Sequence, residues 1–513
     1  MPQSAWLRRW WPLILVIIAV YLTLGVSRAL TTLPWNDEAW YASPSLSLIQ
    51  HGNTATPLLE TTGKFWKGIN QQTYWVVPLQ FFAQAPWFKL FGFSLLSARL
   101  HATAWGLVAL LCWGAIVHRL TQSAAMGLFT MTLMVCDYQF VSQTALARMD
   151  AMALALASLA ILLYLDSRER NIGWAVLASQ LAVVACGLTH PTAGVPAFAA
   201  LLFLTLYLDR RRLRWSYFAL ALLPYGLGLA FWGWYISAAP DLFRAQFFGN
   251  VSDIDRLGGF AHPFTAMVRE ARRYAEMAGF VGDVNPIHRI KAAALVVYAI
   301  ALLSLLRNRE TRQNPGIRIL LWLWAVYFLS MTFYENTKDV KYAIHIVALY
   351  DALAAVWIVY WWPRGGVRRF AVAASAICLI LTGLGGLLYT SLVKDDYHRA
   401  FLPAAMFLKQ AAQPHDLILA SSEFGFPLGF DRNIVDDHAF TYDSHKSPDF
   451  IVIGNGYRRA LDHSRLAHPE VYKYFKDLLD RNYTLVYSHA GYDIFKIRHR
   501  TASPGLTSRS GSG

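Results

Sequence analysis

The stretch YWVVPLQFFAQAPWFKLFGF, residues 74–93, decides how the rest of this chain is arranged. It is apolar over a length that would let a helix cross a bilayer, for which about 20 residues are needed. It also contains Pro78, Gln80, Pro86 and Lys89, which are costly inside lipid and well tolerated at a membrane surface. We therefore predict that residues 74–93 lie at the membrane surface and do not cross.

The remainder of the sequence has the composition of a membrane protein. Of its 513 residues, 56% are hydrophobic and only 15% are charged, whereas soluble domains usually carry about 25% charged residues. Apolar runs of spanning length recur along the chain. They predict eleven transmembrane helices, at 11–30, 99–118, 123–141, 149–165, 171–189, 191–208, 215–237, 290–306, 317–334, 342–362 and 368–391.

Arginine clusters between these runs predict the orientation of the chain. If residues 74–93 stay outside, the clusters share one side with Arg8 and Arg9, and the positive-inside rule places that side in the cytoplasm. The clusters are Arg119, Arg168 with Arg170, and the groups within 210–214, 307–318 and 364–369. If the stretch crosses, every one of them lies outside. The same distribution accounts for the net charge of +14 without a nucleic-acid partner.

Two long outer loops interrupt the predicted transmembrane domain, which covers residues 1–392. They comprise residues 31–98 and 238–289. In the second loop, the apolar residues of 262–279 recur at helical spacing, and arginines complete an amphipathic helix suited to the membrane surface.

The chain changes character after residue 392. Strand-like runs occur at 416–421, 450–454, 483–488 and 492–497, with a helical stretch at 469–482. Because short strands alternate with helical patterns over about 100 residues, we predict a small extracytoplasmic α/β domain at 393–500. The polar residues 501–513 are predicted to be disordered.

Three carboxylates just outside predicted spans are the candidate catalytic residues. Ionisable groups near membrane depth are costly and are therefore often functional. Asp37 and Glu38 follow the first span within the aromatic segment PWNDEAWY, where partial burial would make a carboxylate a stronger base. Asp150 follows Arg148 at the predicted outer mouth of the fourth span. The alternatives are a solvated loop start for the first two and a simple ion pair for Asp150.

Basic residues on the predicted outer side are candidate ligands of a phosphate group. Lys338 and Lys341 lie in the short loop ENTKDVKY, where a lysine binds phosphate as a point charge or extends along the membrane surface. His190, in the bend GLTHP, is placed to donate to phosphate or sugar, and a plain bend is the alternative. The full set of candidate phosphate- and substrate-binding residues is Lys67, Arg148, His190, Lys338, Lys341 and Tyr342.

Missing motifs narrow the chemistry further. The sequence has no G-x-x-x-x-G-K-[ST] loop, no H-E-x-x-H motif and no G-x-S-x-G elbow, so ATP-driven transport, zinc chemistry and serine hydrolysis are unsupported. No definite metal site and no certain cofactor are predicted, although a divalent metal ion is compatible with the outer carboxylates. A cytosolic nucleotide-sugar would not reach these carboxylates, whereas a phosphate-bearing donor dissolved in the membrane would.

Several motifs occur in an order that carries a resemblance. They are W-x-D-E-x-x-Y at 35–41, FKLFG at 88–92 with ARL at 98–100, R-x-D at 148–150, GLTHP at 187–191 and a lysine–tyrosine pair at 341–342. Over roughly residues 1–390 the chain resembles the GT-C membrane glycosyltransferases, in the branch of protein O-mannosyltransferases, lipid A aminoarabinose transferases and rhizobial galacturonosyltransferases. Many relatives have a lysine followed by two prolines where this chain has FWKGINQQTYWVVP, which leaves Lys67 as the nearest counterpart.

The resemblance implies a GT-C-like polytopic α-helical fold and an inverting sugar transfer from a polyprenyl-phosphate donor. It implies that Asp37 is the catalytic acidic residue, that Asp150 is the second acidic position, and that Lys341 and Tyr342 approximate the donor-phosphate site. The expected partners are the polyprenyl-phosphate-linked donor, membrane lipids, and an acceptor glycan, lipid or protein.

We therefore predict a multi-pass glycosyltransferase of the cell membrane, with its N-terminus in the cytoplasm and its C-terminal domain outside. Two alternatives stay open: a flippase or transporter of lipid-linked sugars without transferase activity, and an oligosaccharide ligase with a larger donor. Charges paired inside spans and inverted repeats would favour a transporter, whereas the charges here gather at the outer mouths of spans.

Overall fold

The computed structural model describes residues 3–63, 66–253, 258–281 and 289–498. The chain divides into two compact units. The first, called the helical unit below, consists of Met1–Thr32, Asp37–Pro57 and Lys64–Asp396. The second, called the sheet unit, consists of Leu33–Asn36, Leu58–Gly63 and Tyr397–Gly513. The tail predicted to be disordered, 501–513, lies outside the described residues.

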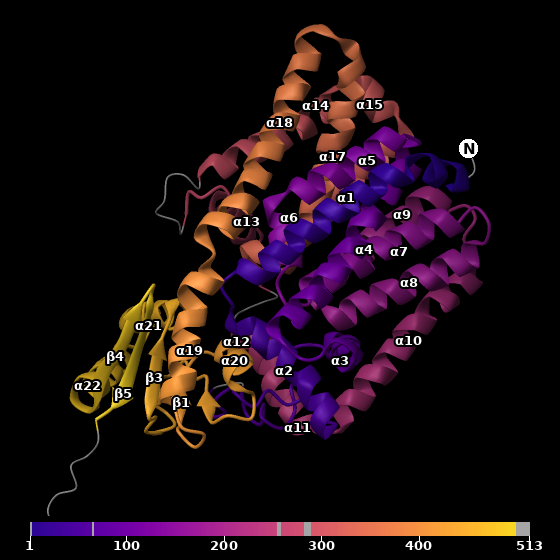
Figure 1. Ribbon diagram of the computed structural model, residues 1–513. Coiled ribbons are helices and arrows are strands. Elements are labelled where there is room, and N and C mark those ends of the chain that lie inside the picture. Colours follow the sequence, from indigo (N-terminus) through magenta and orange to yellow (C-terminus); the bar gives the residue numbers. More distant parts are fainter. Residues whose placement is uncertain (1–2, 64–65, 254–257, 282–288, 499–513) are drawn as a thin grey trace, which may run out of the picture. The chain divides into compact units, whose positions relative to one another are not determined.

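Long helices make up most of the helical unit (Figure 1). In the described ranges, nine helices are long and apolar enough to cross a membrane, or ten if the bent pair α5 and α6 counts as one span. The nine are α1 (Gln3–Thr31), α4 (Leu95–Thr121), α7 (Asp150–Ser167), α8 (Ile172–Thr189), α9 (Pro191–Asp209), α10 (Trp215–Ser237), α16 (Pro315–Tyr334), α17 (Ile344–Trp361) and α18 (Gly366–Leu388). The predicted polytopic membrane architecture is confirmed.

The remaining predicted span, 290–306, corresponds to α14 (Lys291–Arg307), which has 17 residues. It is one residue shorter than α7 and α8 and lies at the lower end of the length range of transmembrane helices. The described helices thus include nine or ten longer candidate spans, and α14 would complete the predicted eleven.

Residues 74–93 contain the short helix α3 (Leu79–Phe91), which has 13 residues. Its length of about 20 Å is too small to cross a bilayer, in agreement with the prediction that this stretch does not cross. The helix ends at Gly92, whose φ of 78° lies in the left-handed region that glycine adopts without strain.

The predicted span 123–141 is broken into α5 (Ala124–Cys136) and α6 (Tyr138–Thr144), with a bend of 69° between them. Asp137 stands at the break and accepts a hydrogen bond of 2.6 Å from the backbone N–H of Phe140. An aspartate in this position satisfies one of the free N–H groups of a new helix. The break therefore starts α6 in a new direction.

Shorter elements connect the spans. They are α2 (Asn36–His51), α11 (Pro240–Phe243), the π-helix η1 (Arg244–Phe248), α12 (Gly249–Asp253), α13 (Pro263–Met277), α15 (Arg309–Gln313), the 3₁₀ helices η3 (Val340–Ala343) and η4 (Trp362–Arg364), and the π-helix η5 (Tyr389–Lys394). Three of them, α2, α13 and η3, contribute residues to the candidate site.

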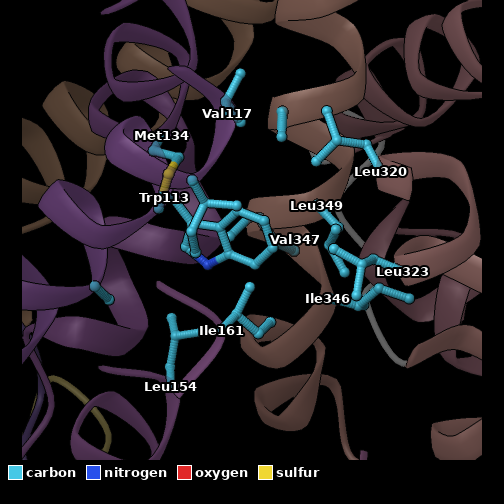
Figure 2. Packing of buried hydrophobic residues seen from close by; sticks show 14 of the residues in the cluster. Trp113, Val117, Met134, Leu154, Ile161, Leu320, Leu323, Ile346, Val347 and Leu349 are labelled. Atoms are coloured by element: carbon cyan, nitrogen blue, oxygen red, sulfur yellow. The ribbon is translucent and has the colours of Figure 1, made fainter. Parts of the chain in front are cut away.

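The core of the helical unit forms where α4, α5, α7, α16 and α17 converge (Figure 2). Trp113 of α4 lies at its centre and is 1% exposed, beside Met134 of α5 and Ile161 of α7. Because lipid tails are as apolar as these side chains, close packing rather than water exclusion holds membrane helices together. This packing makes a rigid support for the ends of the helices, where the candidate site lies.

The sheet unit holds a five-stranded sheet of order β2-β1-β3-β5-β4. The strands β1 (Ile418–Leu419), β2 (Ile434–Val435) and β3 (Phe450–Ile453) run parallel, and β4 (Tyr483–His489) and β5 (Tyr492–Ile497) form an antiparallel hairpin that pairs with β3 through β5. The helical elements are η6 (Tyr397–Phe401), α19 (Leu402–Ala411), η7 (Ser422–Phe424), α20 (Gly425–Leu428), α21 (Asn455–Ala467) and α22 (Pro469–Asn482). A small C-terminal sheet domain is thus confirmed.

Side chains of the sheet unit alternate between two apolar clusters. Phe450 and Val452 join the cluster that contains Phe401 of η6, whereas Ile451 and Ile453 join the one that contains Phe475 of α22. Successive strand residues point to opposite faces of a sheet, so β3 has an apolar cluster on each face.

Candidate active site

The first turn of α2 carries two carboxylates with different surroundings. The side chain of Asp37 is 15% exposed, whereas that of Glu38 is fully buried. Successive residues of an α-helix point about 100° apart. One carboxylate therefore faces a cavity while its neighbour faces the protein interior.

Glu38 forms a buried bidentate ion pair with Arg99 of α4. Arg99 Nε and Nη2 donate to the two carboxylate oxygens, each at 2.7 Å, and the backbone N–H of Ala147 donates to Glu38 Oε1 at 2.9 Å. Arg99 Nη1 also donates to the carbonyl oxygens of Ala29 at 2.7 Å and Thr32 at 3.0 Å. These contacts tie the start of α2 to α1, α4 and the segment before α7. They favour a positioning role for Glu38 over the catalytic role predicted from the sequence.

Asp37 lies between two cations. It forms an ion pair with Arg148, and Lys341 Nζ of η3 lies 3.7 Å from Asp37 Oδ2. Lys341 also pairs with Asp339 at 2.9 Å. The guanidinium carbon of Arg148 lies 5.3 Å from the centre of the Tyr41 ring, within the range of a cation–π contact. Asp37 therefore lies against two cations at the edge of an aromatic surface.

Asp150 supports Arg148 from behind. Arg148 Nε donates to Asp150 Oδ2 at 2.9 Å, and Asp150 is only 1% exposed. Its other oxygen lies 3.6 Å from His190 Nε2 and 3.7 Å from His345 Nε2. Burial disfavours the charge of Arg148, but Asp150 and Asp339 nearby raise its pKa, so the guanidinium stays positive. Asp150 therefore orients the guanidinium of Arg148 and does not line the cavity in front of Asp37.

A cavity of about 700 Å³ lies in front of Asp37. Six cations and three carboxylates line it: Arg148, Arg269, Arg272, Arg273, Lys338 and Lys341, with Asp37, Glu276 and Asp339. Tyr41, Trp75 and Tyr342 complete much of the remaining wall. This cavity, called the cationic cavity below, has the size of ligand sites in proteins and an excess of positive charge that suits an anionic ligand.

Burial lowers the pKa of two of these cations, Lys338 and Lys341, each to about 8. Lys338 is 5% exposed, and desolvation lowers its pKa to about 8, with Arg273 adding to the lowering and Glu270 opposing it. Lys338 Nζ donates to the carbonyl oxygens of Met331 and Thr332, each at 2.6 Å. Its charge is thus sensitive to an anion brought into the cavity.

Two smaller cavities continue from the cationic cavity. The first, of about 240 Å³, shares Tyr41, Trp75 and Tyr342 with it and is also lined by His190 and Glu335. The second, of about 400 Å³, shares Val77, Pro191 and Phe247 with the first and has an almost entirely apolar lining from α8, α9 and α10. A polar space beside Asp37 therefore adjoins an aromatic-lined space, which in turn adjoins an apolar space among the helices α8, α9 and α10.

The structure brings most predicted site residues together, with one exception. Asp37, Arg148, Lys338, Lys341 and Tyr342 line the cationic cavity, His190 lines the adjoining one, and Glu38 and Asp150 lie behind. Lys67 is exposed and is not among the residues that line these cavities. Its backbone carbonyl accepts a hydrogen bond from Gln246 Nε2 at 3.0 Å.

Sequence reasoning missed two groups of site residues. Arg99 stands within the motif ARL at 98–100, but no role was assigned to it, and His345 begins a long apolar helix in which nothing in the local sequence marks it. Arg269, Arg272 and Arg273 were attributed to a membrane-surface helix, although three arginines on a predicted outer loop depart from the positive-inside rule. That departure was the signal that pointed to an anion site.

In the part of the chain that the structure describes, no group of three or more His, Cys, Asp and Glu side chains is placed to hold a metal ion.

Comparisons with known proteins show similarity in structure but not in sequence. No protein-family model and no curated protein matches the sequence. ArnT from Cupriavidus metallidurans, solved with undecaprenyl phosphate, matches over 96% of this chain and 99% of its own, with a TM-score of 0.63 and 14% identity. The archaeal oligosaccharyltransferase AglB from Archaeoglobus fulgidus, in complex with an inhibitory peptide and a dolichol-phosphate, matches over 93% of this chain and 69% of its own, with a TM-score of 0.51 and 12% identity.

Both of these structures are GT-C glycosyltransferases. This chain has the GT-C fold. The architecture that the motif order implied is therefore confirmed over nearly the whole chain. At these levels of identity the similarity establishes the fold alone, and the reaction has to be argued from the site.

Proposed function

We propose that this protein is a membrane glycosyltransferase that transfers a sugar from a polyprenyl-phosphate-linked donor to an acceptor, with inversion at the anomeric carbon. The observation that carries the proposal is Asp37, held by Arg148 and Lys341 at the edge of a cavity with an excess of positive charge. A carboxylate provides a base, and the two cations provide a site for the leaving phosphate.

The reaction would proceed in one displacement. Asp37 accepts the proton of the acceptor hydroxyl or amine as that atom bonds to the anomeric carbon. The bond from this carbon to the donor phosphate breaks on the opposite face, and its electron pair stays on the phosphate oxygen. Arg148 and Lys341 stabilise the charge that grows there.

Donor binding would also prepare the base. Without a donor, Asp37 forms ion pairs with Arg148 and Lys341. A bound phosphate competes for the same cations, which weakens their hold on Asp37 and increases its proton affinity. The residue would then become a stronger base only when a donor is present.

The two adjoining cavities suit the lipid part of such a donor. The apolar cavity among α8, α9 and α10 would accept a hydrocarbon chain, and the 240 Å³ cavity, which shares Tyr41, Trp75 and Tyr342 with the cationic cavity, lies next to it. A phosphate at Lys341 would thus have its lipid chain directed into the membrane helices.

A transfer assay tests the proposal. Purified protein in detergent is incubated with a radiolabelled polyprenyl-phosphate-sugar and extracts of candidate acceptors, and the label is followed from donor to product. Transfer with inverted anomeric configuration supports the proposal. Movement of the intact donor across vesicle membranes without transfer would instead identify a flippase, and transfer only from oligosaccharide donors would identify a ligase.

Lys341→Ala should weaken donor binding more than it slows turnover at saturating donor. The reason is that the cation already contacts phosphate in the ground state, and only part of its effect grows in the transition state. Undecaprenyl phosphate affinity, measured by calorimetry, and the kinetic constants separate the two effects. The matched control is Lys89→Ala, at an exposed lysine of α3. Unchanged affinity in the Lys341 variant would exclude it as a phosphate ligand.

We further propose that the site faces the non-cytoplasmic side of the cell membrane, on the evidence of the arginine distribution. Single cysteines placed at Gln122 and His445 test this orientation with a membrane-impermeant reagent applied from outside. We expect labelling at position 445 and none at 122. The reverse pattern would contradict the orientation.

A further inference from the structure

A further cavity lies among the membrane helices, lined by residues of α14, α17 and α18 and of the break between α5 and α6. It has a volume of about 120 Å³, which leaves room for several water molecules. Three carboxylates line this cavity, called the acidic cavity below. They are Asp137, Glu276 and Asp351, and the cation among the lining residues is Lys291. The excess charge here is therefore negative, opposite to that of the cationic cavity.

Two of these carboxylates meet at one tyrosine of α14. The hydroxyl oxygen of Tyr298 lies 2.7 Å from Asp351 Oδ1 and 3.2 Å from Asp137 Oδ2. The first distance is that of a normal hydrogen bond and the second that of a long one. A tyrosine hydroxyl has one hydrogen and donates to one oxygen at a time. If both carboxylates are ionised, one of the two contacts brings oxygen atoms together with no hydrogen between them.

Asp351 is buried with an unused oxygen atom. Its side chain is 1% exposed and lines the acidic cavity, and among the described residues its Oδ2 has no hydrogen-bond partner. It stands about 10 Å along the axis from the start of α17, inside a membrane-spanning helix. An uncompensated charge at such a depth is costly, and ionisable groups inside spans are usually functional.

Lys291 does not neutralise this pair of aspartates directly. Its Nζ lies 5.2 Å from the centre of the Tyr138 ring, in cation–π contact, and the guanidinium carbon of Arg28 lies 5.9 Å from the centre of the same ring. In the part of the chain that the structure describes, Lys291 forms no ion pair with Asp137 or Asp351. The two aspartates therefore lack a directly bound counter-charge from the protein.

We infer that the acidic cavity binds one cation of unit charge, a proton or a sodium ion, at Asp137, Asp351 and Tyr298. With a proton on Asp351, its O–H donates to the Tyr298 oxygen and the Tyr298 O–H donates to Asp137, so both contacts become hydrogen bonds. With a sodium ion, the unpartnered Oδ2 of Asp351 becomes a ligand, since hard cations take carboxylate oxygens. Either occupant removes one of two adjacent negative charges. The inference goes beyond the proposed function and does not rest on it.

The acidic cavity adjoins the candidate active site through η3. Val340 and Glu276 line both the acidic and the cationic cavity. Gln139, which follows the break in α6, donates from Nε2 to the carbonyl oxygen of Val340 at 2.7 Å, and the residue after Val340 is Lys341. A cation that holds Asp137 at the start of α6 therefore also steadies η3.

The titratable groups that face the two aspartates come from several elements. They are Lys291 and Tyr298 of α14, Tyr350 of α17, Cys136 and Tyr138 beside the break, and Glu276 of α13, whereas the lining residues of α18 carry no titratable group. In an infrared spectrum, the C=O stretch of a carboxylic acid lies apart from the bands of carboxylates, phenols, thiols and amines. A buried proton on an aspartate can therefore be observed directly.

Infrared spectra of the full-length protein in detergent, at neutral pH in sodium-free choline buffer, test for the proton. A proton in the site gives a carboxylic acid band that is lost in Asp351→Asn. The matched control is Asp477→Asn, at an exposed aspartate of α22, which should leave the band unchanged. Asparagine has the shape of aspartate and its amide can donate to the Tyr298 oxygen, so the Asp351 variant should fold.

Thermal unfolding in rising sodium concentrations tests for the sodium ion. An ion that binds only the folded protein raises the unfolding temperature with its concentration. If sodium is the occupant, this rise occurs in the wild type and is lost in Asp351→Asn, and choline at equal ionic strength has no such effect. We expect at least one of the two signals, and we expect the Asp351 variant to abolish it.

Tyr298→Phe provides a second measurement that does not alter either carboxylate. It removes the shared hydroxyl, so a proton on Asp351 loses its hydrogen-bond partner and the acid band should shift in frequency. A sodium ion would lose one ligand, and a higher sodium concentration should be needed for the same rise in unfolding temperature.

Three results would overturn the inference. The first is the absence of an acid band in choline buffer together with no effect of sodium on the unfolding temperature. The second is a band or sodium effect that Asp351→Asn leaves unchanged, which would place the cation elsewhere. The third is an acid band that appears only when Lys291 is replaced with methionine, because Lys291 would then be the counter-ion of the pair.

Discussion

Replacing Asp37 with asparagine should lower turnover by about 10²–10⁴-fold, the contribution usual for a positioned general base. The amide has nearly the same shape and still accepts hydrogen bonds from Arg148, but it cannot take the proton of the acceptor. Folding should be preserved, because Asp37 is partly exposed and the buried contacts of α2 are made by its neighbour Glu38.

The same substitution should leave donor affinity unchanged or increase it. Arg148 and Lys341 each lose a negative neighbour, so the donor phosphate no longer competes with a carboxylate for them. Slow turnover combined with undiminished donor binding is a result that a purely structural role for Asp37 would not produce. Single-turnover rates and calorimetry with undecaprenyl phosphate measure the two quantities.

Asp339→Asn is the matched control for Asp37→Asn. Asp339 also lines the cavity and pairs with Lys341 at 2.9 Å, so its variant changes the local charge equally while leaving the base in place. We expect a much smaller loss of turnover. Near wild-type turnover in the Asp37 variant, or a product with retained anomeric configuration, would refute the assignment of Asp37 as the base.

Replacing Glu38 with glutamine should destabilise the helical unit by about 3–5 kcal/mol, the usual result of removing one partner of a buried ion pair. The charge of Arg99 would remain fully buried, opposite an amide that cannot neutralise it. Because Arg99 also holds the carbonyl groups of Ala29 and Thr32, the end of α1 and the start of α2 should loosen together. Thermal unfolding in detergent measures the loss.

An exposed ion pair provides the comparison for Glu38. Arg458 and Asp493 in the sheet unit lie 2.5 Å apart with 43% and 23% of their side chains exposed. Such pairs contribute about 0–1 kcal/mol, so Asp493→Asn should leave the unfolding temperature nearly unchanged. If Glu38→Gln unfolds at the wild-type temperature as well, the pair does not hold α2 in place.

The adjacent residues Asp37 and Glu38 show how far the candidate site could be predicted. Both are carboxylates at the start of one helix, among the same aromatic residues, and the sequence supplied no means of separating their roles. Their separation depends on Arg99, which is 61 residues away from Glu38 in the chain. Arg148 likewise reaches Asp37 across 111 residues. Contacts between residues so far apart in the chain cannot be predicted from the residues next to them.

The amphipathic stretch at 262–279 shows the same limit. Its helical period was readable because the spacing of apolar residues is a local property, and α13 indeed covers Pro263–Met277. Which side of it faces the cationic cavity depends on α16 and η3, which pack against it. The arginines of α13 therefore became candidate ligands only in the folded chain.

The order of short motifs carried the resemblance that implied the GT-C fold. The sequence by itself also determined the membrane class, the approximate positions of the spans, the non-crossing stretch at 74–93 and the small C-terminal sheet domain. Each of these follows from the length, period and order of apolar and polar runs along the chain, which are set by neighbouring residues. Only the tertiary structure decided which carboxylate faces the cavity, that Asp150 lies behind Arg148, that Lys67 does not line the cavities, and that three further arginines, Arg269, Arg272 and Arg273, do. These facts depend on where distant segments meet, and the packing of helix against helix sets those meetings.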